Sequence, residues 1–353
     1  MRYLITGGAG FIGSHLCDQL LSCGHRITVI DDLSTGAAAN LEHLRQIGEL
    51  KFICGSVFER RLMAELIDDA DIIVHLAAAV GVRLIVENPI RTIETNVSGT
   101  EIVLKLASKK QRRVMIASTS EVYGKAVKFP FCEDDDLTLG PTVRSRWSYA
   151  CSKMLDEFLA LAYFRERQTP VTIVRLFNTV GPRQTGHYGM VVPRFVQQAL
   201  TGQPITVFGD GKQSRCFGYV GDVARGIVQL SLEATAIGEV FNLGSNEEIT
   251  INELAELVRE MTGTRSSVVH VPYEQAYDFG FEDMRRRVPS LEKAKRFIGY
   301  RATVGIREIV QQVIDYFKRG EQALSSLPEV VADGQRTSPA SRTLYAGSSS
   351  GGK

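Results

Sequence analysis

Two residues that could move a proton, Tyr149 and Lys153, lie four positions apart in the segment RSRWSYACSKMLDEF. Residues with this spacing share one face of a helix, so the two side chains are expected to be neighbours. A phenol with its ordinary pKa of about 10 is a poor base at neutral pH. A nearby ammonium group favours the phenolate and lowers that pKa, as would a positively charged cofactor. The pair therefore predicts a general base, provided that its surroundings form an active site.

A run of polar residues, Ser118-Thr119-Ser120-Glu121, directly follows the strand-like segment RRVMIA. Ligands of parallel α/β sheets bind at the carboxyl ends of the strands, so these side chains are candidates for substrate contact. A turn that enters a helix, with one of these residues as its N-cap, accounts for Thr119, Ser120 and Glu121 equally well.

Three glycines, Gly7, Gly10 and Gly13, lie between the strand-like segment RYLIT and a helix-like segment. Glycine lets the backbone turn tightly and approach a pyrophosphate, while the helix N-terminus offers N–H groups and a positive dipole end. Asp31 ends a second strand-like segment, eighteen residues beyond Gly13. A carboxylate there accepts hydrogen bonds from ribose hydroxyls and repels a 2′-phosphate, which favours NAD over NADP.

The elements that would position these residues alternate along the first half of the chain. Strand-like segments are expected at 2–6, 25–31, 50–55, 70–78, 112–119 and 171–177, and helices at 15–22, 61–67, 90–108 and 149–165. Strands separated by helices pair in parallel. The predicted fold class is therefore α/β, with a Rossmann doubly wound parallel sheet.

Three regions are expected. Residues 1–177 form the NAD-binding Rossmann domain, including the Tyr/Lys helix. Residues 178–319, with helices at 192–200 and 251–261, form a smaller, intertwined substrate-binding domain from which some segments return to the Rossmann part. Residues 320–353 are rich in Ser, Gly, Pro and Ala without a periodic apolar face, which is typical of a disordered tail.

Composition narrows the function further. The 353 residues carry a formal net charge of +1, which gives no indication of nucleic-acid or membrane binding. The chain opens directly into a strand, which leaves no room for a signal peptide. The six cysteines are scattered without a CxxC pair, so free thiols and a cytoplasmic location are expected. The histidines show no ligand-like spacing, and no metal is expected: His15, His25, His43, His75, His187 and His270.

The motifs together resemble the extended short-chain dehydrogenase/reductases, the NAD-dependent nucleotide-sugar epimerase/dehydratase family. The resemblance runs from Met1 to about Tyr316 and rests on TGGAGFIGSH, HLAA, STSEVYG, YxxxK, RLFNTVGPRQ, GDGKQSRCFGYVGDV and FNLGSNEEITINELAE. It implies that Tyr149 removes the proton of a sugar hydroxyl as hydride passes to NAD. It also implies that Lys153 binds the nicotinamide ribose and that Thr119 hydrogen-bonds the reacting sugar oxygen.

The same resemblance implies two sets of binding residues. The cofactor would contact Gly7, Gly10, Phe11, Ile12, Gly13, Asp31, Asp32, Ser56, Val57, Leu76, Ala77, Ala78, Asn96, Tyr149 and Lys153. The nucleotide-sugar would contact Thr119, Asn178, Val192, Pro193, Arg194, Phe208, Arg215 and Arg287. Many family members carry Asp after the third strand to hold the adenine, whereas this chain has Ser56, whose hydroxyl can still accept a hydrogen bond.

The residues after Thr119 favour one reaction. The family's 4,6-dehydratases carry Asp-Glu there, and Ser120-Glu121 lacks that acid. Simple 4-epimerases often carry small or neutral residues, so Glu121 is unexpected for them. Thr-Ser-Glu, RSRWSY and the Arg287-x-Pro-Ser segment look most similar to UDP-glucuronate decarboxylases of the UDP-xylose-forming type.

That chemistry passes through a 4-keto intermediate. Oxidation at C4 of a glucuronate gives a β-keto acid, which loses CO2 because the new carbonyl stabilises the enolate. Thr119 and Tyr149 would stabilise that oxygen, and Glu121 with Ser120 or Arg287 would protonate C5. The basic cluster of Arg144, Arg146, Arg285, Arg286 and Arg287 suits an acidic sugar, although at least three of the five are expected on a solvated face.

Two alternatives remain open at this point. A 4-epimerase of UDP-glucuronate or a UDP-hexose shares the early steps but returns the hydride to the other face of the sugar. A non-catalytic NAD-sensing Rossmann protein would have no need of Tyr149, Lys153 and Thr119. The helices at 90–108 and 149–165 have apolar residues on more than one side, and the resemblance implies a homodimer that pairs them in a four-helix bundle.

Overall fold

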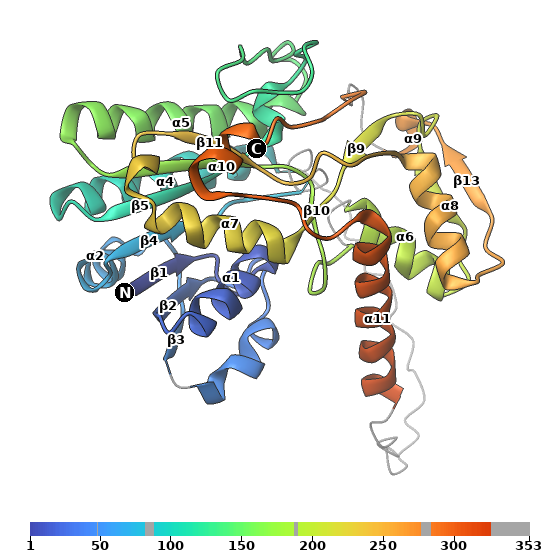
Figure 1. The fold of residues 1–353 in the computed structure, drawn as a ribbon, viewed down its shortest axis with the longest axis horizontal. Coiled ribbons are helices and arrows are strands. Elements are labelled where there is room, and N and C mark those ends of the chain that lie inside the picture. The colour runs from blue at the N-terminus through green and yellow to red at the C-terminus, as the bar shows by residue number, and fades with distance from the viewer. Residues whose placement is uncertain (48, 82–87, 187–189, 277–283, 326–353) are drawn as a thin grey trace, which may run out of the picture.

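The computed structural model describes residues 1–47, 49–81, 88–186, 190–276 and 284–325. A seven-stranded parallel sheet forms its larger lobe (Figure 1). In spatial order the strands are β11 (Val240–Leu243), β6 (Val171–Leu176), β5 (Arg113–Thr119), β4 (Ile72–His75), β1 (Arg2–Thr6), β2 (Arg26–Asp31) and β3 (Leu50–Cys54). The order reverses at β1, as expected for a doubly wound sheet, so the predicted fold class is confirmed.

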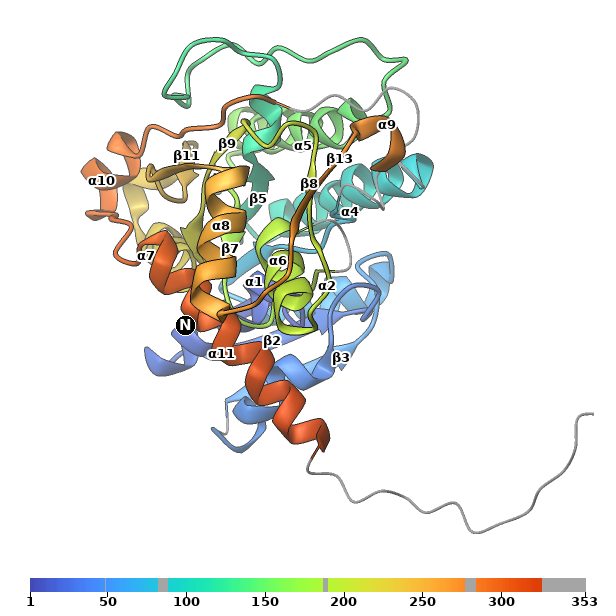
Figure 2. The same cartoon turned by 90° about the vertical axis from the view of Figure 1, so that its right-hand side faces the viewer.

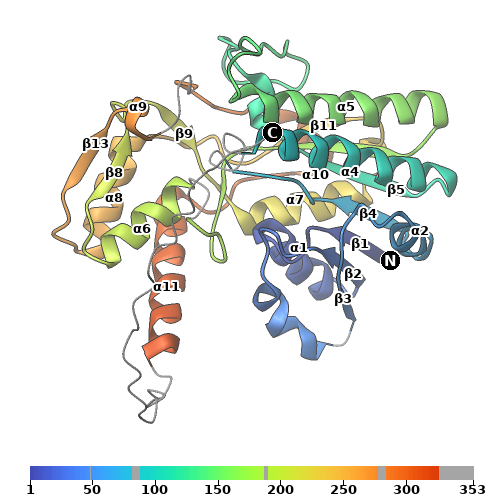
Figure 3. The same ribbon diagram turned by 180° about the vertical axis from the view of Figure 1, so that it is seen from behind.

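Helices cover both faces of this sheet (Figure 3). Helices α1 (Phe11–Ser22) and α7 (Val220–Leu232) pack on one face. The other face carries α2 (Arg60–Asp69), α4 (Pro89–Lys109) and α5 (Trp147–Arg167). Burial on both faces explains why the central strands read as continuous apolar runs rather than alternating ones; every residue of β4 is buried.

The smaller lobe has its own core, formed by α6 (Val191–Leu200), α8 (Ile251–Thr262) and α11 (Ile306–Ser325) with short strands (Figure 2). A capping box at Thr250 and Glu253 begins α8, and Gly263 ends it in the left-handed conformation. The strands are β8 (Ile205–Phe208) with β13 (Val268–Val271), and β9 (Ser214–Cys216) with β12 (Glu248–Thr250).

Short elements join the two lobes or extend them. They are η1 (Ala38–Ile47), η2 (Ser120–Tyr123), β7 (Thr179–Val180), β10 (Gly218–Tyr219), η3 (Ala234–Ala236), α9 (Tyr273–Ala276) and α10 (Glu292–Ile298). Helix α7 and strand β11 follow residue 178 in sequence yet belong to the sheet lobe, where β11 forms its edge. The region after residue 178 thus contributes segments to both lobes.

The C-terminal boundary differs from the prediction. Helix α11 continues to Ser325, past residue 319, where the folded part was expected to end. Residues 326–353, most of the predicted tail, lie outside the described residues. Within the described ranges, no helix is long and apolar enough to cross a membrane. All six cysteines are described and are free thiols. The cytoplasmic location stays a prediction.

Candidate active site

A cavity of about 790 Å³ lies at the carboxyl ends of the parallel strands, with the smaller lobe closing its other side. All the predicted site residues but one line it. From the sheet lobe these are Gly7, Gly10, Phe11, Ile12, Gly13, Asp31, Asp32, Ser56, Val57, Leu76, Ala77, Ala78, Thr119, Ser120, Glu121, Tyr149 and Lys153. From the segments after β6 they are Asn178, Val192, Pro193, Arg194, Phe208, Arg215 and Arg287.

The glycine turn between β1 and α1 forms a cradle that fits a dinucleotide. Gly7 has a φ of +73°, and a Cβ at Gly13 would lie 2.4 Å from the Gly7 carbonyl oxygen, so neither position tolerates a side chain. The N-cap of α1 is Gly10, and no side chain caps the helix there. The N–H groups of its first turn therefore face the cavity as an anion site.

Asp31 lies at the end of β2, beside this turn, and is only 8% exposed. Its carboxylate accepts hydrogen bonds from Ala9 N at 2.9 Å and Leu33 N at 2.8 Å. Burial raises the pKa of Asp31, and these backbone N–H groups oppose the rise. The bonds fix the carboxylate at the cavity wall, where its remaining lone pairs can receive ribose hydroxyls.

Asn96 is the predicted cofactor residue that does not line the cavity. It is 1% exposed, its Oδ1 accepts a bond from Ala79 N at 2.9 Å, and its Nδ2 donates to Ser152 Oγ at 3.1 Å. Asn96 therefore supports the segment after β4 from behind. The sequence analysis placed Asn96 near the cofactor. The packing of α4 on α5 decides that its side chain points to Ala79 and Ser152 and not into the cavity.

Tyr149 and Lys153 lie on one face of α5, as their spacing predicts, and both reach the cavity wall. Tyr149 is 7% exposed. Burial and the charge of Glu121 raise its pKa, whereas a hydrogen bond with Thr119 lowers it. Lys153 lies one helical turn from Tyr149. Its ammonium group donates to Asp156 Oδ2 at 2.7 Å.

Thr119 caps a turn and also lines the cavity. It is the N-cap of η2, where its Oγ1 accepts a bond from Glu121 N at 3.3 Å. It also lines the cavity beside Tyr149. The cap holds the hydroxyl in place, so the turn itself positions this residue.

Glu121 lies at the centre of a buried cluster of charges. Its Oε2 accepts a hydrogen bond from Arg146 Nη1, and its Oε1 lies 3.7 Å from Arg287 Nη1. Arg287 Nη1 also lies 3.4 Å from both Ser120 Oγ and Asn178 Oδ1. Burial favours the neutral form of Glu121, but Arg146 and Arg287 outweigh it and hold its pKa below the usual value. Glu121 is therefore ionised at neutral pH.

The five arginines of the predicted basic cluster differ in their burial. Arg146 and Arg287 are buried, 3% and 6% exposed, and line the cavity. Arg285 and Arg286 are exposed and Arg144 is half-buried. Arg286 pairs with Glu248 at the surface.

At the far end of the cavity, two predicted residues, Arg194 and Phe208, lie beside two residues that the sequence analysis did not identify, Gln213 and Tyr273. The Arg194 guanidinium lies 4.0 Å from the ring centre of Phe208, forming a flat, cationic wall. Gln213 Nε2 donates to Phe208 O and to Tyr273 OH, both at 3.0 Å. Gln213 stands in the GDGKQSR motif, but Tyr273 follows no motif, and only the packing of α9 against the loop at Gly209 brings it here.

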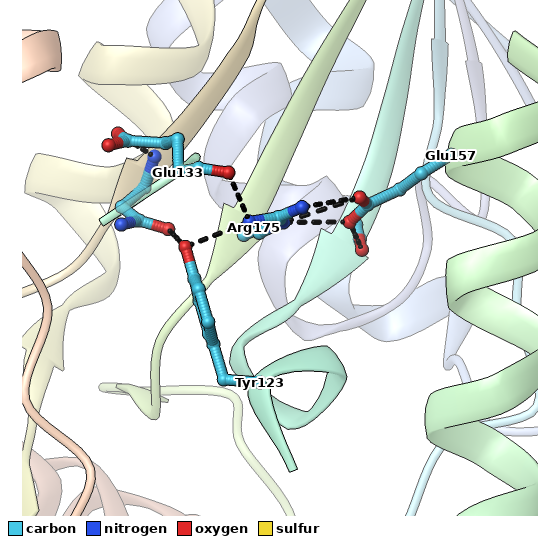
Figure 4. Close-up of polar contacts among 6 residues, drawn as sticks. Tyr123, Glu133, Glu157 and Arg175 are labelled. Atoms are coloured by element: carbon cyan, nitrogen blue, oxygen red, sulfur yellow. Dashed lines mark hydrogen bonds and ion pairs between the residues drawn. The ribbon is translucent and has the colours of Figure 1, made fainter. Parts of the chain in front are cut away.

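A buried hydrogen-bond network behind the cavity joins the catalytic elements (Figure 4). Arg175 on β6 donates to both carboxylate oxygens of Glu157 on α5, at 3.0 Å and 2.8 Å. Ser118 Oγ donates to the same carboxylate. Arg175 Nη1 also donates to Tyr123 OH at 3.0 Å, and Tyr123 in turn donates to Asn242 Oδ1 at 2.8 Å.

This network fixes two segments relative to each other. Ser118 and Tyr123 stand on either side of the turn that carries Thr119, Ser120 and Glu121. Glu157 belongs to the helix that carries Tyr149 and Lys153. Buried, fully paired polar networks rigidify what they join. In the described ranges, no group of three or more His, Cys, Asp or Glu side chains is placed to hold a metal, and His187 lies outside them.

A model of the GDP-mannose 4,6-dehydratase family matches residues 4–313. The chain belongs to this family. Its resemblance to NAD-dependent nucleotide-sugar enzymes is thereby confirmed, and the protein is an enzyme. The alternative of a non-catalytic NAD sensor is set aside.

Relatives within the family have more specific names. The UDP-N-acetyl-α-D-glucosaminuronate decarboxylase of Bacillus cytotoxicus is 42% identical over 321 residues, covering 91% of this chain and 98% of the relative. UDP-glucuronic acid decarboxylase 1 of Danio rerio is 38% identical over 318 residues, covering 90% of this chain and 73% of the relative.

Solved structures of the family share the fold. The UDP-glucuronic acid 4-epimerase of Bacillus cereus, in complex with UDP-glucuronic acid and NAD, superposes with a TM-score of 0.81 at 28% identity, covering 90% of this chain and 99% of that one. The dTDP-glucose 4,6-dehydratase of Streptomyces venezuelae, with NAD bound, has a TM-score of 0.82 at 31% identity, covering 92% and 98%. Solved members of the family thus bind NAD in this fold.

Proposed function

We propose that this protein is an NAD-dependent decarboxylase of a UDP-linked uronic acid, with UDP-glucuronate as the first candidate substrate. The observation that carries the proposal is the buried cluster around Glu121. Arg146, Arg287 and Arg215 all act on this single carboxylate, so the cavity has an excess of positive charge where the sugar would lie. A uronate carboxylate suits this excess, because guanidinium groups bind carboxylates through two parallel hydrogen bonds.

The cavity residues divide the work of the first step. Tyr149 takes the proton of the C4 hydroxyl, and Thr119 holds that oxygen. The glycine cradle would hold NAD, which when bound would supply a hydride acceptor for C4 and later the hydride donor. Lys153 would bind the nicotinamide ribose. Hydrogen bonds within the protein itself hold the Asp31 carboxylate and the Thr119 hydroxyl in place.

The second step is the loss of CO2 from the 4-keto acid. Arg287 binds the carboxylate, and Thr119 with Tyr149 stabilises the enolate oxygen at C4. Glu121 is ionised in the free enzyme and therefore has no proton to give. Ser120, whose Oγ lies 3.4 Å from Arg287 Nη1, would pass a proton to C5 instead.

The decisive experiment is incubation of the purified protein with NAD and UDP-glucuronate. UDP-N-acetylglucosaminuronate is tested in parallel, because one decarboxylase relative is named for the N-acetylated sugar and the other for the sugar without the N-acetyl group. The product is analysed by mass spectrometry and NMR. A product lighter by CO2 supports the proposal and identifies the sugar. An unchanged mass with inverted C4 stereochemistry establishes the 4-epimerase instead.

Replacing Glu121 with Gln is expected to move the acid limb of the rate profile to lower pH. Burial and the Glu121 charge both raise the pKa of Tyr149 in the protein alone, and the positive nicotinamide ring of bound NAD would lower it. Activity is lost as pH falls through the resulting pKa, because the base becomes protonated. Removing the negative charge lowers the pKa of Tyr149, so the base stays ionised further into the acid range. The kcat/KM profiles of Glu121→Gln and wild type give the comparison. A limb that stays in place, or moves to higher pH, contradicts this role for Glu121.

The protein is also proposed to be a homodimer that pairs α4 and α5 with their copies. Large apolar side chains are exposed along these helices: Ile90 (72%), Ile93 (43%), Leu155 (49%) and Phe158 (67%). Leu155 and Phe158, with Cys151, recur at three- and four-residue spacing and form one stripe. Two such helices from each protomer would bury the stripe in a four-helix bundle.

Phe158→Glu is expected to weaken this dimer by roughly 100-fold or more. Burying a phenylalanine contributes about 1.5–3 kcal/mol, and each dimer contains two copies of the residue. Sedimentation velocity at several concentrations measures the change. Val127→Glu is the matched control, because Val127 is 88% exposed but lies outside α4 and α5. A wild-type protein that sediments as a monomer at micromolar concentration contradicts the proposal.

A further inference from the structure

A buried carboxylate that the mechanism above does not use lies directly beside the catalytic lysine. Asp156 is fully buried, at 0% exposed, and its Oδ2 accepts a hydrogen bond from Lys153 Nζ at 2.7 Å. Lys153 itself is 3% exposed. Tyr149, Lys153 and Asp156 occupy positions i, i+4 and i+7 of α5, so all three lie on the face of the helix that borders the cavity.

Other charged and titratable groups surround this pair from several elements. His75 on β4 is 1% exposed, and burial together with the Lys153 charge lowers its pKa to about 3, so it is neutral. Glu157 on α5 is held by Arg175 and Ser118. The carboxylate of Glu157 is therefore paired with Arg175 and not with Lys153.

Toward the sugar end of the cavity, Glu121 on η2 is paired with Arg146, which directly precedes α5, and with Arg287. Burial raises the pKa of Asp156 and the Lys153 charge opposes that rise. Among the described residues around Lys153, Asp156 is thus the carboxylate that bonds to its ammonium group.

The bond follows from the geometry of the helix. Side chains on a helix lean toward its N-terminus, so the carboxylate of Asp156 leans back toward Lys153, three residues before it. The ammonium group of Lys153 donates to this carboxylate. An ammonium group has three N–H donors, so it can keep this bond and still donate to hydroxyls in the cavity. Asp156 therefore fixes one of the three donors and with it the place of the charge.

We propose that Asp156 is a positioning residue that acts through Lys153, as the counter-ion that keeps the buried ammonium group charged and directed before the ribose of NAD arrives. This inference rests on the proposed function, from which Lys153 takes its role at the ribose. A lysine buried without a counter-charge loses its proton more readily than one in water. A neutral amine would bind the ribose hydroxyls less well and would no longer favour the Tyr149 phenolate.

The test is the pH dependence of NAD binding to the full-length protein, measured by calorimetry without any sugar. In wild type, the affinity for NAD is expected to stay constant from mildly acidic to mildly alkaline pH. In Asp156→Asn, which keeps the shape but not the charge, affinity is expected to match wild type at acidic pH. It then falls roughly tenfold as pH rises, because Lys153 loses its proton.

Two further variants establish that Asp156 acts through Lys153. In a Lys153→Met background, Asp156→Asn should change neither the NAD affinity nor its pH dependence. Asp156→Glu, which keeps the charge, should restore the flat profile. A flat profile for Asp156→Asn, or an equal effect of that change in the Lys153→Met background, overturns the proposal.

A measurement on the wild type covers the case in which Asp156→Asn does not fold. The ¹⁵N resonance of Lys153 Nζ, assigned by its loss in Lys153→Met, should report a charged ammonium group throughout the range studied. Loss of the proton within that range overturns the proposal. Neither measurement needs turnover, so a protein that binds NAD as expected but converts no UDP-uronate refutes the proposed function and leaves the role of Asp156 standing.

Discussion

Tyr149→Phe is expected to lower the rate of sugar oxidation by about 10²- to 10⁴-fold, the usual range for loss of a positioned general base. Phenylalanine keeps the ring, which packs at 7% exposure against the cavity wall, and removes only the hydroxyl that bonds with Thr119. Binding of the nucleotide-sugar should therefore change little, and the loss should fall on kcat. Single-turnover kinetics and calorimetry with UDP-glucuronate measure the two effects separately.

Tyr163→Phe is the matched control for this change. Tyr163 lies on the same helix, α5, but packs on the sheet side with the core and does not line the cavity. It should keep the wild-type rate. A Tyr149→Phe enzyme with more than about a tenth of the wild-type rate would show that another group takes the proton.

Arg287→Met is expected to lower kcat/KM for the UDP-uronate by roughly 30-fold to several thousandfold. Removing one partner of a buried, hydrogen-bonded charge pair costs about 2–5 kcal/mol, and the substrate carboxylate would lose that partner. Methionine keeps much of the buried volume. The affinity for UDP-glucose, which has no carboxylate, should fall much less, so the ratio of the two affinities is the measurement that isolates the charge.

Arg286→Met provides the neighbouring control. Arg286 is adjacent in sequence but exposed, and it pairs with Glu248 on the surface. Its replacement should leave the affinities for the UDP-uronate and for UDP-glucose unchanged. An Arg287→Met enzyme that loses affinity equally for the acidic and the neutral sugar would mean that Arg287 binds the shared UDP part and not the carboxylate.

Local sequence patterns were sufficient for most of the sheet lobe. The strands predicted at 2–6 and 171–177 and the helices predicted at 90–108 and 149–165 agree with the structure to within two residues. These segments combine strong apolar periodicity with clear ends, such as Pro89 at the start of α4. The glycine spacing at Gly7 and Gly13 also carries its own physical reason, since a side chain there would collide with the backbone.

The sequence was less informative where an element is short or where its environment determines its role. Strand β11 has four residues, and only its pairing with β6 makes it the edge of the sheet. Asn96 stands within the right region, yet its polar atoms bond to Ala79 and Ser152 because α4 packs on α5. Tyr273 reaches the cavity through tertiary packing alone.

By itself, the sequence determined the fold class, the dinucleotide cradle and the Tyr149/Lys153 pair, because each depends on spacing within one strand, turn or helix. The tertiary structure decided which charges meet. Arg146 and Arg287 lie 141 residues apart in the chain yet both face Glu121, whereas Arg286, next to Arg287, faces solvent. Spacing along the chain predicts neighbours only within an element. The protonation state of a buried carboxylate depends on every charge that folding brings near it.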